Sequence, residues 1–333
     1  MRNTKLLCAG LALAICIGCG SNTPQQAAAP SPSAAAAETA VPTETPVPGD
    51  ETVVVETRDT PKPSLPPTPT PTPTPTPSPA PSPTPTPEPT PAPTPEPITA
   101  ERLDAGEFDA YFDDALLIGD SLTDILSGYV RKQRQTDEDF LGAAKVLGTT
   151  SMSVKTASAN KAYPNGISFR YRGKAVSITE CIDACEAKKV FIMLGVNDIG
   201  TRSWDDVQAY YATLIDVIRE NCPDTEIVLQ GVLPVTSRYC GEHKLKIDRW
   251  NSFNDILAGI CAEHGAAFLD FSKLFMDGNG YLDTKLSSDK QFHLNETGEA
   301  IWIRTLRLYA AMHMLPEAAA DASLTENVRI VEP

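Results

Sequence analysis

The stretch ALLIGDSLTD, residues 115–124, is a short apolar run that ends in a Gly-Asp-Ser turn. Residues 115–118 have the length and the unbroken apolarity of a buried strand. Ser121 then opens a stretch that has a helical pattern as far as residue 130. We therefore expect a strand that leads directly into a helix, with a serine at the helix N-terminus.

The same alternation continues along the chain. Further strand-like runs lie at 143–147, 189–194, 226–232 and 266–270, and helical patterns at 177–187, 204–221, 247–263 and 297–314. A polar stretch with the turn signal Asn165-Gly166 predicts a hairpin within 160–177. Short apolar runs separated by helices indicate parallel strands covered on both faces. The predicted fold is a three-layer α/β/α sandwich with a central, mostly parallel five-stranded sheet of flavodoxin-like type.

Proline sets the N-terminal boundary of this domain. Of the 30 prolines, 25 lie between Pro24 and Pro97, and no packed domain accommodates proline at every second position. We expect a linker without a core over 20–100, a folded domain over 101–315 and a flexible acidic tail over 316–333. Proline alternation over 61–97 favours polyproline II, which would extend to roughly 115 Å. We interpret this segment as a flexible tether. The alternative is a spacer that carries the domain outward through a cell-wall layer.

Residues 1–19 have the pattern of a secretory signal. Arg2 and Lys5 precede a short apolar run that ends in Gly18-Cys19, and the run is too short to span a bilayer. The pattern resembles a bacterial lipoprotein signal, which implies a lipid on Cys19; a plain signal peptide is the alternative. Cys16 stands where leucine is usual in such signals. Lipidation predicts anchoring to the membrane surface without a spanning helix.

Charge argues against nucleic acid as a partner. The whole chain has a net charge of −15, and residues 101–333 hold 24 Lys and Arg against 35 Asp and Glu. Such a surface repels phosphate backbones unless a basic stripe is present. The basic residues are scattered along the sequence, and the one short cluster is at 131–134.

Polar residues follow the predicted strands at the edge where ligands bind in open parallel sheets. Ser121 follows the first strand, Gly148 the second and Asn197 the third, and His293 precedes the last helix. A serine nucleophile needs a base such as histidine. An oxyanion needs convergent donors, and backbone N–H groups and an asparagine amide are suitable. The set predicts acyl-transfer chemistry.

These residues resemble the four blocks of the SGNH hydrolases, also called the GDSL esterase/lipase family, over about 113–312. IGDSLTD (118–124) and IMLGVNDIG (192–200) carry the resemblance. It implies that Ser121 is the nucleophile and that His293 is the general base. It also implies an oxyanion hole of Ser121, Gly148 and Asn197, of which Gly148 rests on its strand position alone.

The acid of the triad is the point where the chain departs from the family. The acid usually lies three residues before the histidine, where this chain has Lys290, whereas Asp289 lies four before. We expect one extra residue in the turn to bring the Asp289 carboxylate to the imidazole. The alternative is a Ser-His dyad whose ring is oriented by a backbone carbonyl.

The remaining candidate ligands point to no metal or cofactor. Five cysteines follow the signal, and no Cys/His grouping has zinc spacing; they are Cys181, Cys185, Cys222, Cys240 and Cys261. The pair at 181 and 185 is one helical turn apart, where a disulfide is strained. The remaining histidines at 243, 264 and 313 are expected on the surface, and Asp120 and Asp198 are expected to hold loops.

The sequence therefore predicts an extracytoplasmic, lipid-anchored serine esterase. Its expected substrate is an acyl ester, for instance an acetyl group on a cell-wall or other polysaccharide. One alternative is a lipase, lysophospholipase or acyltransferase that uses the same site. The other is a non-catalytic surface binding domain that keeps the fold.

Overall fold

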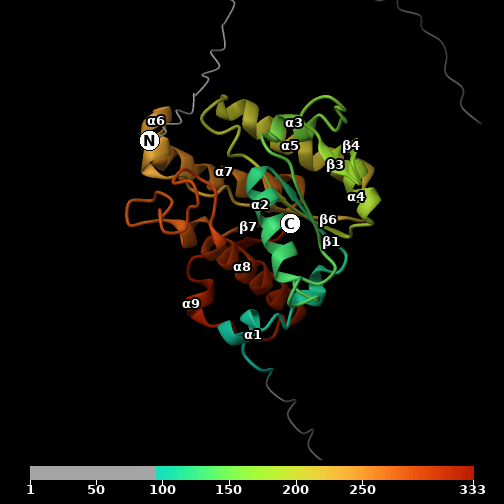
Figure 1. The fold of residues 1–333 in the computed structure, drawn as a ribbon, viewed down its shortest axis with the longest axis vertical. Coiled ribbons are helices and arrows are strands. Elements are labelled where there is room, and N and C mark those ends of the chain that lie inside the picture. The colour runs from blue at the N-terminus through green and yellow to red at the C-terminus, as the bar shows by residue number, and fades with distance from the viewer. Residues whose placement is uncertain (1–94) are drawn as a thin grey trace, which may run out of the picture. The chain divides into compact units, whose positions relative to one another are not determined.

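The computed structural model describes residues 95–333 (Figure 1). The predicted signal, the lipidation site Cys19 and the linker as far as residue 94 lie outside these residues. The predicted domain boundary at 101 is a few residues late, because Ile98 is fully buried and bridges to Ala320. Within residues 95–333, no helix has both the length and the apolarity needed to cross a membrane.

The main sheet has six strands in the order β2-β1-β5-β6-β7-β8. The first five are parallel to one another and confirm the predicted runs; they are β1 (Ala115–Gly119), β2 (Lys145–Gly148), β5 (Lys189–Met193), β6 (Glu226–Gln230) and β7 (Ala267–Asp270). If these five parallel strands are numbered 1 to 5 along the chain, their order across the sheet is 2-1-3-4-5, which is the flavodoxin-like arrangement. The chain continues from β1 to β2 on one side and then crosses to β5 on the other side of β1. At such a reversal of strand order a crevice forms beyond the carboxyl ends of the two strands, here β1 and β5.

The sixth strand corrects the predicted count of five. β8 (Arg329–Val331) pairs antiparallel with β7, and the short helix α9 (Ala322–Thr325) precedes it. The segment 316–333, expected to be a flexible tail, therefore supplies the edge strand. Its three residues show no clear alternation of apolar and polar side chains and gave no strand signal in the sequence. A strand this short forms because its backbone pairs with a neighbouring strand, here β7.

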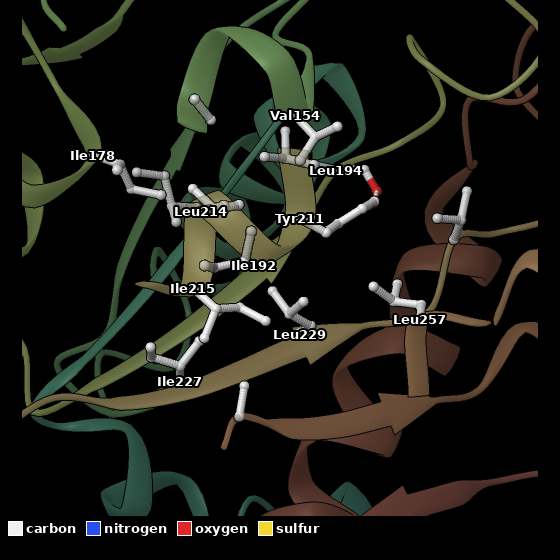
Figure 2. Close-up of a cluster of buried hydrophobic side chains, with 14 of the residues drawn as sticks. Val154, Ile178, Ile192, Leu194, Tyr211, Leu214, Ile215, Ile227, Leu229 and Leu257 are labelled. Carbon is white, nitrogen blue, oxygen red and sulfur yellow. Dashed lines mark hydrogen bonds between the residues drawn. The ribbon is translucent and has the colours of Figure 1, made fainter. Parts of the chain in front are cut away.

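Helices cover both faces of the sheet, because successive residues of each buried strand point to opposite sides. Leu116 and Ile118 pack on one side with helices α3 to α5 and α7, whereas Ala115 and Leu117 pack on the other with α1, α2 and α8. Figure 2 shows β5 and β6 side chains meeting those of α5 in the first of these layers. The helix bounds are α1 (Ala100–Asp104), α2 (Ser121–Gln133), α3 (Val154–Ser158), α4 (Ile178–Cys185), α5 (Trp204–Asn221), α6 (Ser237–His243), α7 (Ile247–His264) and α8 (Glu296–Met314), with 3₁₀ turns at Asp109–Phe112 and Ser272–Phe275.

A separate two-stranded hairpin follows α3. Its strands are β3 (Phe169–Tyr171) and β4 (Lys174–Val176). The hairpin lies within the predicted range, but its turn is Arg172-Gly173 rather than Asn165-Gly166. Both turn residues have positive φ, 49° and 81°, as a two-residue hairpin turn of this class requires.

Candidate active site

Ser121 lies at the junction of β1 and α2, at the carboxyl edge of the sheet. Asp120 is the N-cap of α2, and its Oδ1 accepts the Leu122 N–H at 3.0 Å. A side chain at Gly119 would overlap the Met193 carbonyl and the Thr123 side chain. Glycine at that position therefore lets β1 turn into α2 while it stays paired with β5. The hydroxyl of Ser121 is thus held on the first turn of a helix, and the side chain is half-buried.

His293 lies in the loop before α8 and contacts this serine. The distance from Ser121 Oγ to His293 Nε2 is 2.9 Å, across 172 residues of sequence. Backbone hydrogen bonds fix the loop on both sides of the ring: Ser288 N–H donates to the His293 carbonyl, and Asn295 N–H donates to that of Leu286. The imidazole is therefore positioned to accept the hydroxyl proton.

Asp289 reaches the far side of the same ring. Its Oδ2 lies 2.7 Å from His293 Nδ1, while its Oδ1 accepts backbone N–H groups, that of Gln291 at 2.7 Å among them. Lys290, the extra residue, has a φ of 59°. That left-handed residue folds the chain back, so the four-residue spacing still brings the carboxylate to the imidazole.

The Asp289 carboxyl group is held in its ionised form. Burial alone would raise the pKa of Asp289, but hydrogen bonds from the Gln291 N–H and from His293 outweigh burial, so its pKa lies below the ordinary value. An ionised carboxylate at Nδ1 fixes the proton on that nitrogen and leaves Nε2 free as the acceptor.

Asn197 follows β5 at the same edge, four residues after Met193. Its Nδ2 donates to the Met152 carbonyl at 2.9 Å. A primary amide carries two N–H groups, so one orients the side chain and the second is available for another acceptor. The loop at Met152, which the sequence did not single out, is thus the support of this asparagine.

Gly148 ends β2, directly opposite Gly119 in the strand register. A side chain there would overlap the backbone nitrogen of Asp124 in the first turn of α2. Glycine therefore permits the close approach of β2 to α2, which is a packing reason for the residue. Whether its N–H also serves an oxyanion stays a prediction.

Two buried carboxyl groups lie beneath the site and hold its loops, as expected for Asp120 and Asp198. The Asp198 carboxylate accepts the Val154 N–H at 2.7 Å and pairs with Arg202 at 3.1 Å. Burial raises the pKa of Asp198, and it raises that of Asp120 to about 7, helped by the neighbouring charge of Asp198. Asp198 thereby ties the segment after β2 to the loop after β5, while Asp120 caps α2 after β1.

Other sequence candidates lie apart from this cluster. His264 pairs with Asp216 at 2.7 Å, and His313 with Glu332 at 3.2 Å. The five cysteines in residues 95–333 form no disulfide, and all except Cys185 are buried. Within the same range, no group of three or more His, Cys, Asp and Glu side chains is arranged to hold a metal ion.

The arrangement has the parts that acyl transfer needs. In this geometry Ser121 can act as a nucleophile, with His293 as a base within hydrogen-bonding distance and the Asp289 charge behind that base. Ser121 N–H and the Asn197 amide are donors at the same edge of the sheet. No residue in this cluster requires a cofactor for such a reaction.

Comparisons with known proteins identify the family of this domain. The GDSL-like lipase/acylhydrolase family matches residues 117–301. Solved structures that resemble the chain include a GDSL-like lipase from Bacteroides thetaiotaomicron (14% identity, 65% of this chain and 97% of that one, TM-score 0.46). A mutant of an acetyl-xylooligosaccharide esterase from Geobacillus stearothermophilus is also similar (19% identity, 59% and 93% coverage, TM-score 0.43). No curated protein matches the sequence. Since the family match spans more than half of the chain, the protein belongs to the GDSL-like lipase/acylhydrolase family and is an ester hydrolase of the SGNH type.

Proposed function

We propose that the protein is a serine esterase in which Ser121, His293 and Asp289 form the catalytic triad. The observation that carries this proposal is the continuous hydrogen-bonded chain from Ser121 Oγ to His293 Nε2, at 2.9 Å, and from His293 Nδ1 to Asp289 Oδ2, at 2.7 Å. Loss of the first link leaves the hydroxyl proton without an acceptor, and loss of the second leaves the imidazole without the charge that orients it and stabilises its protonated form.

The reaction proceeds in two halves. Ser121 Oγ attacks the ester carbonyl carbon while His293 Nε2 takes the hydroxyl proton; the tetrahedral intermediate then collapses and its alkoxide leaves with that proton as an alcohol. Water attacks the acyl-serine with His293 again as base. Collapse of the second intermediate releases the carboxylic acid and returns the proton to Ser121. Asp289 stabilises the imidazolium that forms in each half.

The oxyanion of each intermediate needs donors that are fixed before the reaction. The proposed donors are the Ser121 N–H, the Gly148 N–H and the second N–H of the Asn197 amide. Two observations support them: Ser121 lies at a helix N-terminus, where backbone N–H groups face outward, and Asn197 is already oriented by Met152.

The proposed substrate is an acyl ester, and acetyl esters on cell-wall polysaccharide are the first choice. The protein is also proposed to be extracytoplasmic. The support is in the sequence: a lipoprotein-type signal ending at Cys19 and a proline-rich segment long enough to carry the domain outward from a membrane. Replacing Cys19 with alanine should abolish incorporation of labelled fatty acid and release the protein from the membrane fraction. Fatty-acid labelling equal to that of the unaltered chain would remove the anchor from the proposal.

A fluorophosphonate probe tests the mechanism, because a base-activated serine attacks its phosphorus centre. The unaltered protein should gain one probe mass and hydrolyse a short chromogenic ester, and Ser121→Ala should do neither. Ser127→Ala, on the same helix, is the matched control and should keep both properties. Equal labelling of Ser121→Ala would overturn the serine mechanism, whereas no labelling of the unaltered protein favours a non-catalytic binding domain. A panel of acyl lengths separates an esterase from a lipase.

A further inference from the structure

A pocket of about 350 Å³ adjoins the active-site loops and has an unusual charge. It lies between the turn after β5 and the junction of α6 with α7, and it is lined by Ile199, Gly200, Arg202, Trp204, His243, Lys244, Leu245, Lys246, Arg249 and Trp250. Four of these residues are Lys or Arg, and none is Asp or Glu. In a domain with a clear excess of acidic residues, this is a local inversion of charge that the scattered basic residues of the sequence did not indicate.

Three of the cations have no partner of their own. Arg202 pairs with the buried Asp198, but Lys244, Lys246 and Arg249 form no ion pair within residues 95–333. All three are exposed. The acidic residues on the neighbouring helix turns, Asp205, Asp206 and Asp248, do not line the pocket. An anionic ligand is therefore the complement that the pocket lacks.

Packing orients one of the cations, Arg249, and fixes the backbone that carries a second, Lys244. The Arg249 guanidinium lies 4.4 Å from the Trp204 ring centroid, and Phe253 braces that ring edge-on at 5.6 Å. Lys244 ends α6 with a φ of 55° and precedes Leu245, whose side chain fits against the bare backbone of Gly200. A guanidinium that is oriented before binding loses less entropy when it contacts a ligand.

The pocket is connected to the proposed catalytic histidine by a run of neighbouring rings, which are tilted or edge-on to one another. His243, which lines the pocket, lies 4.2 Å from the Tyr239 ring; Tyr239 lies 5.2 Å from Phe292, and Phe292 lies 4.3 Å from His293. On its other side the pocket begins two residues after Asn197. One extended substrate can therefore place its ester carbonyl at Ser121 and another part in the pocket.

We infer that this pocket is a substrate subsite for an anionic glycan, a sugar chain that carries carboxylate or phosphate groups beside the acylated unit. The inference rests on the proposed function, since it gives that esterase a charged substrate class. A glycan fits better than nucleic acid, because the net negative charge of the domain opposes a duplex with its dense phosphates, whereas a short glycan presents a few charges to one pocket.

Direct binding tests the inference separately from hydrolysis. The full-length chain with Ser121→Ala is titrated with an oligogalacturonate, with an oligo(glycerol phosphate) and with a neutral xylo-oligosaccharide of equal length. We expect at least one anionic oligomer to bind about tenfold more tightly than the neutral one, and its affinity to fall as salt rises from about 0.05 M to about 0.5 M. Which anionic oligomer binds more tightly distinguishes carboxylate from phosphate.

Matched variants locate the binding. In the same background, Lys244→Gln, Lys246→Gln and Arg249→Gln together should weaken anionic binding about 10- to 100-fold. The charge-preserving set Lys244→Arg, Lys246→Arg and Arg249→Lys should weaken it far less. A control set at the far ends of the elements, Arg131→Gln, Lys145→Gln and Lys188→Gln, removes as much charge and should leave binding unchanged.

The outcomes separate the two proposals. Equal binding of neutral and anionic oligomers, or a change of less than about threefold in the glutamine set, overturns the pocket. So does binding by none of the oligomers, even where the unaltered chain hydrolyses short esters. If the anionic oligomer binds as expected but the unaltered chain hydrolyses no ester, the pocket stands and the esterase mechanism fails.

Discussion

Replacement of Asp289 by asparagine should reverse the hydrogen bond that orients His293. Asp289 Oδ1 accepts the backbone N–H groups of Gln291, Phe292 and His293 at 2.7, 3.2 and 3.3 Å. The single carbonyl oxygen of asparagine must take the place of Oδ1, because the three backbone N–H groups would otherwise face an NH₂ group that cannot accept from them. The amide NH₂ then faces His293 Nδ1, which must accept, and the ring proton moves to Nε2. A protonated Nε2 cannot take the proton of Ser121.

The expected loss follows from this change of tautomer. In a Ser-His-Asp triad, the wrong tautomer costs ~10⁴ in rate, equivalent to about 5 kcal/mol in the barrier. Here the side chains of His293 and Asp289 are 27% and 31% exposed, so solvent screens part of the charge and the tautomer accounts for most of the effect. We expect kcat to fall on the order of 10³- to 10⁴-fold with KM little changed, because the lost interaction acts mainly in the transition state.

The assay is saturation kinetics with a short chromogenic ester. Asp283→Asn is the matched control, since Asp283 makes the same kind of turn in the same loop, with its Oδ1 accepting the Lys285 N–H at 2.9 Å and no histidine beside it. That variant should keep normal activity. A fall of less than about threefold for Asp289→Asn would remove Asp289 from the mechanism and leave Ser121 and His293 as a dyad.

Three further changes test the framework of the site. Burial raises the pKa of Asp120 from 3.8 to about 7. The folded protein therefore keeps a proton on Asp120 that the unfolded chain releases, and the fold loses stability as the pH rises between these two values. Asp120→Asn, which still caps α2, should therefore stabilise the fold by on the order of 1–4 kcal/mol at pH 8 and hardly at pH 4. Urea unfolding measures this difference, with the exposed-site variant Asp124→Asn as the control. An equal change in unfolding free energy at both pH values would contradict the reasoning. Gly148→Ala should cost about 1–3 kcal/mol because its methyl group overlaps the α2 backbone, whereas Gly128→Ala, with open space in the same helix, should be neutral or stabilising in the same titration. Truncation after Leu315 removes β8 and should lower the unfolding free energy by at least about 2 kcal/mol; an unchanged midpoint would show that the sixth strand contributes nothing.

The central sheet was predictable because its strands are buried on both faces. A buried strand segment such as 190–193 is apolar at every position, and this leaves a clear signal in the sequence. The polar residues directly after these runs were predictable for the same reason, since parallel strands end at one edge. Ser121 and Asn197 lie at this edge, each after one of the neighbouring strands β1 and β5.

Elements defined by partners far along the chain gave no such signal. β8 has only three residues and forms because β7 has a free edge, and α3 is one turn anchored by Asp198 from a loop 44 residues away. The basic pocket adds Arg202 to the cluster of Lys244, Lys246 and Arg249, which comes from a distant stretch of the chain. Long-range packing, rather than local propensity, decides each of these features.

The proposed nucleophile and its proposed base are held by different kinds of structure, and this explains why spacing alone left the acid open between Asp289 and a dyad. Ser121 lies between a buried strand and a helix, so its position follows from the sheet. His293 and Asp289 lie in a loop whose shape depends on the left-handed Lys290 and on hydrogen bonds such as that from Thr236 N–H to the Gln291 carbonyl. Thr236 also donates its hydroxyl to the Lys290 carbonyl at 2.9 Å. The same residue is the N-cap of α6, which leads to the basic pocket, so the loop that presents the catalytic pair and the proposed subsite share one anchor.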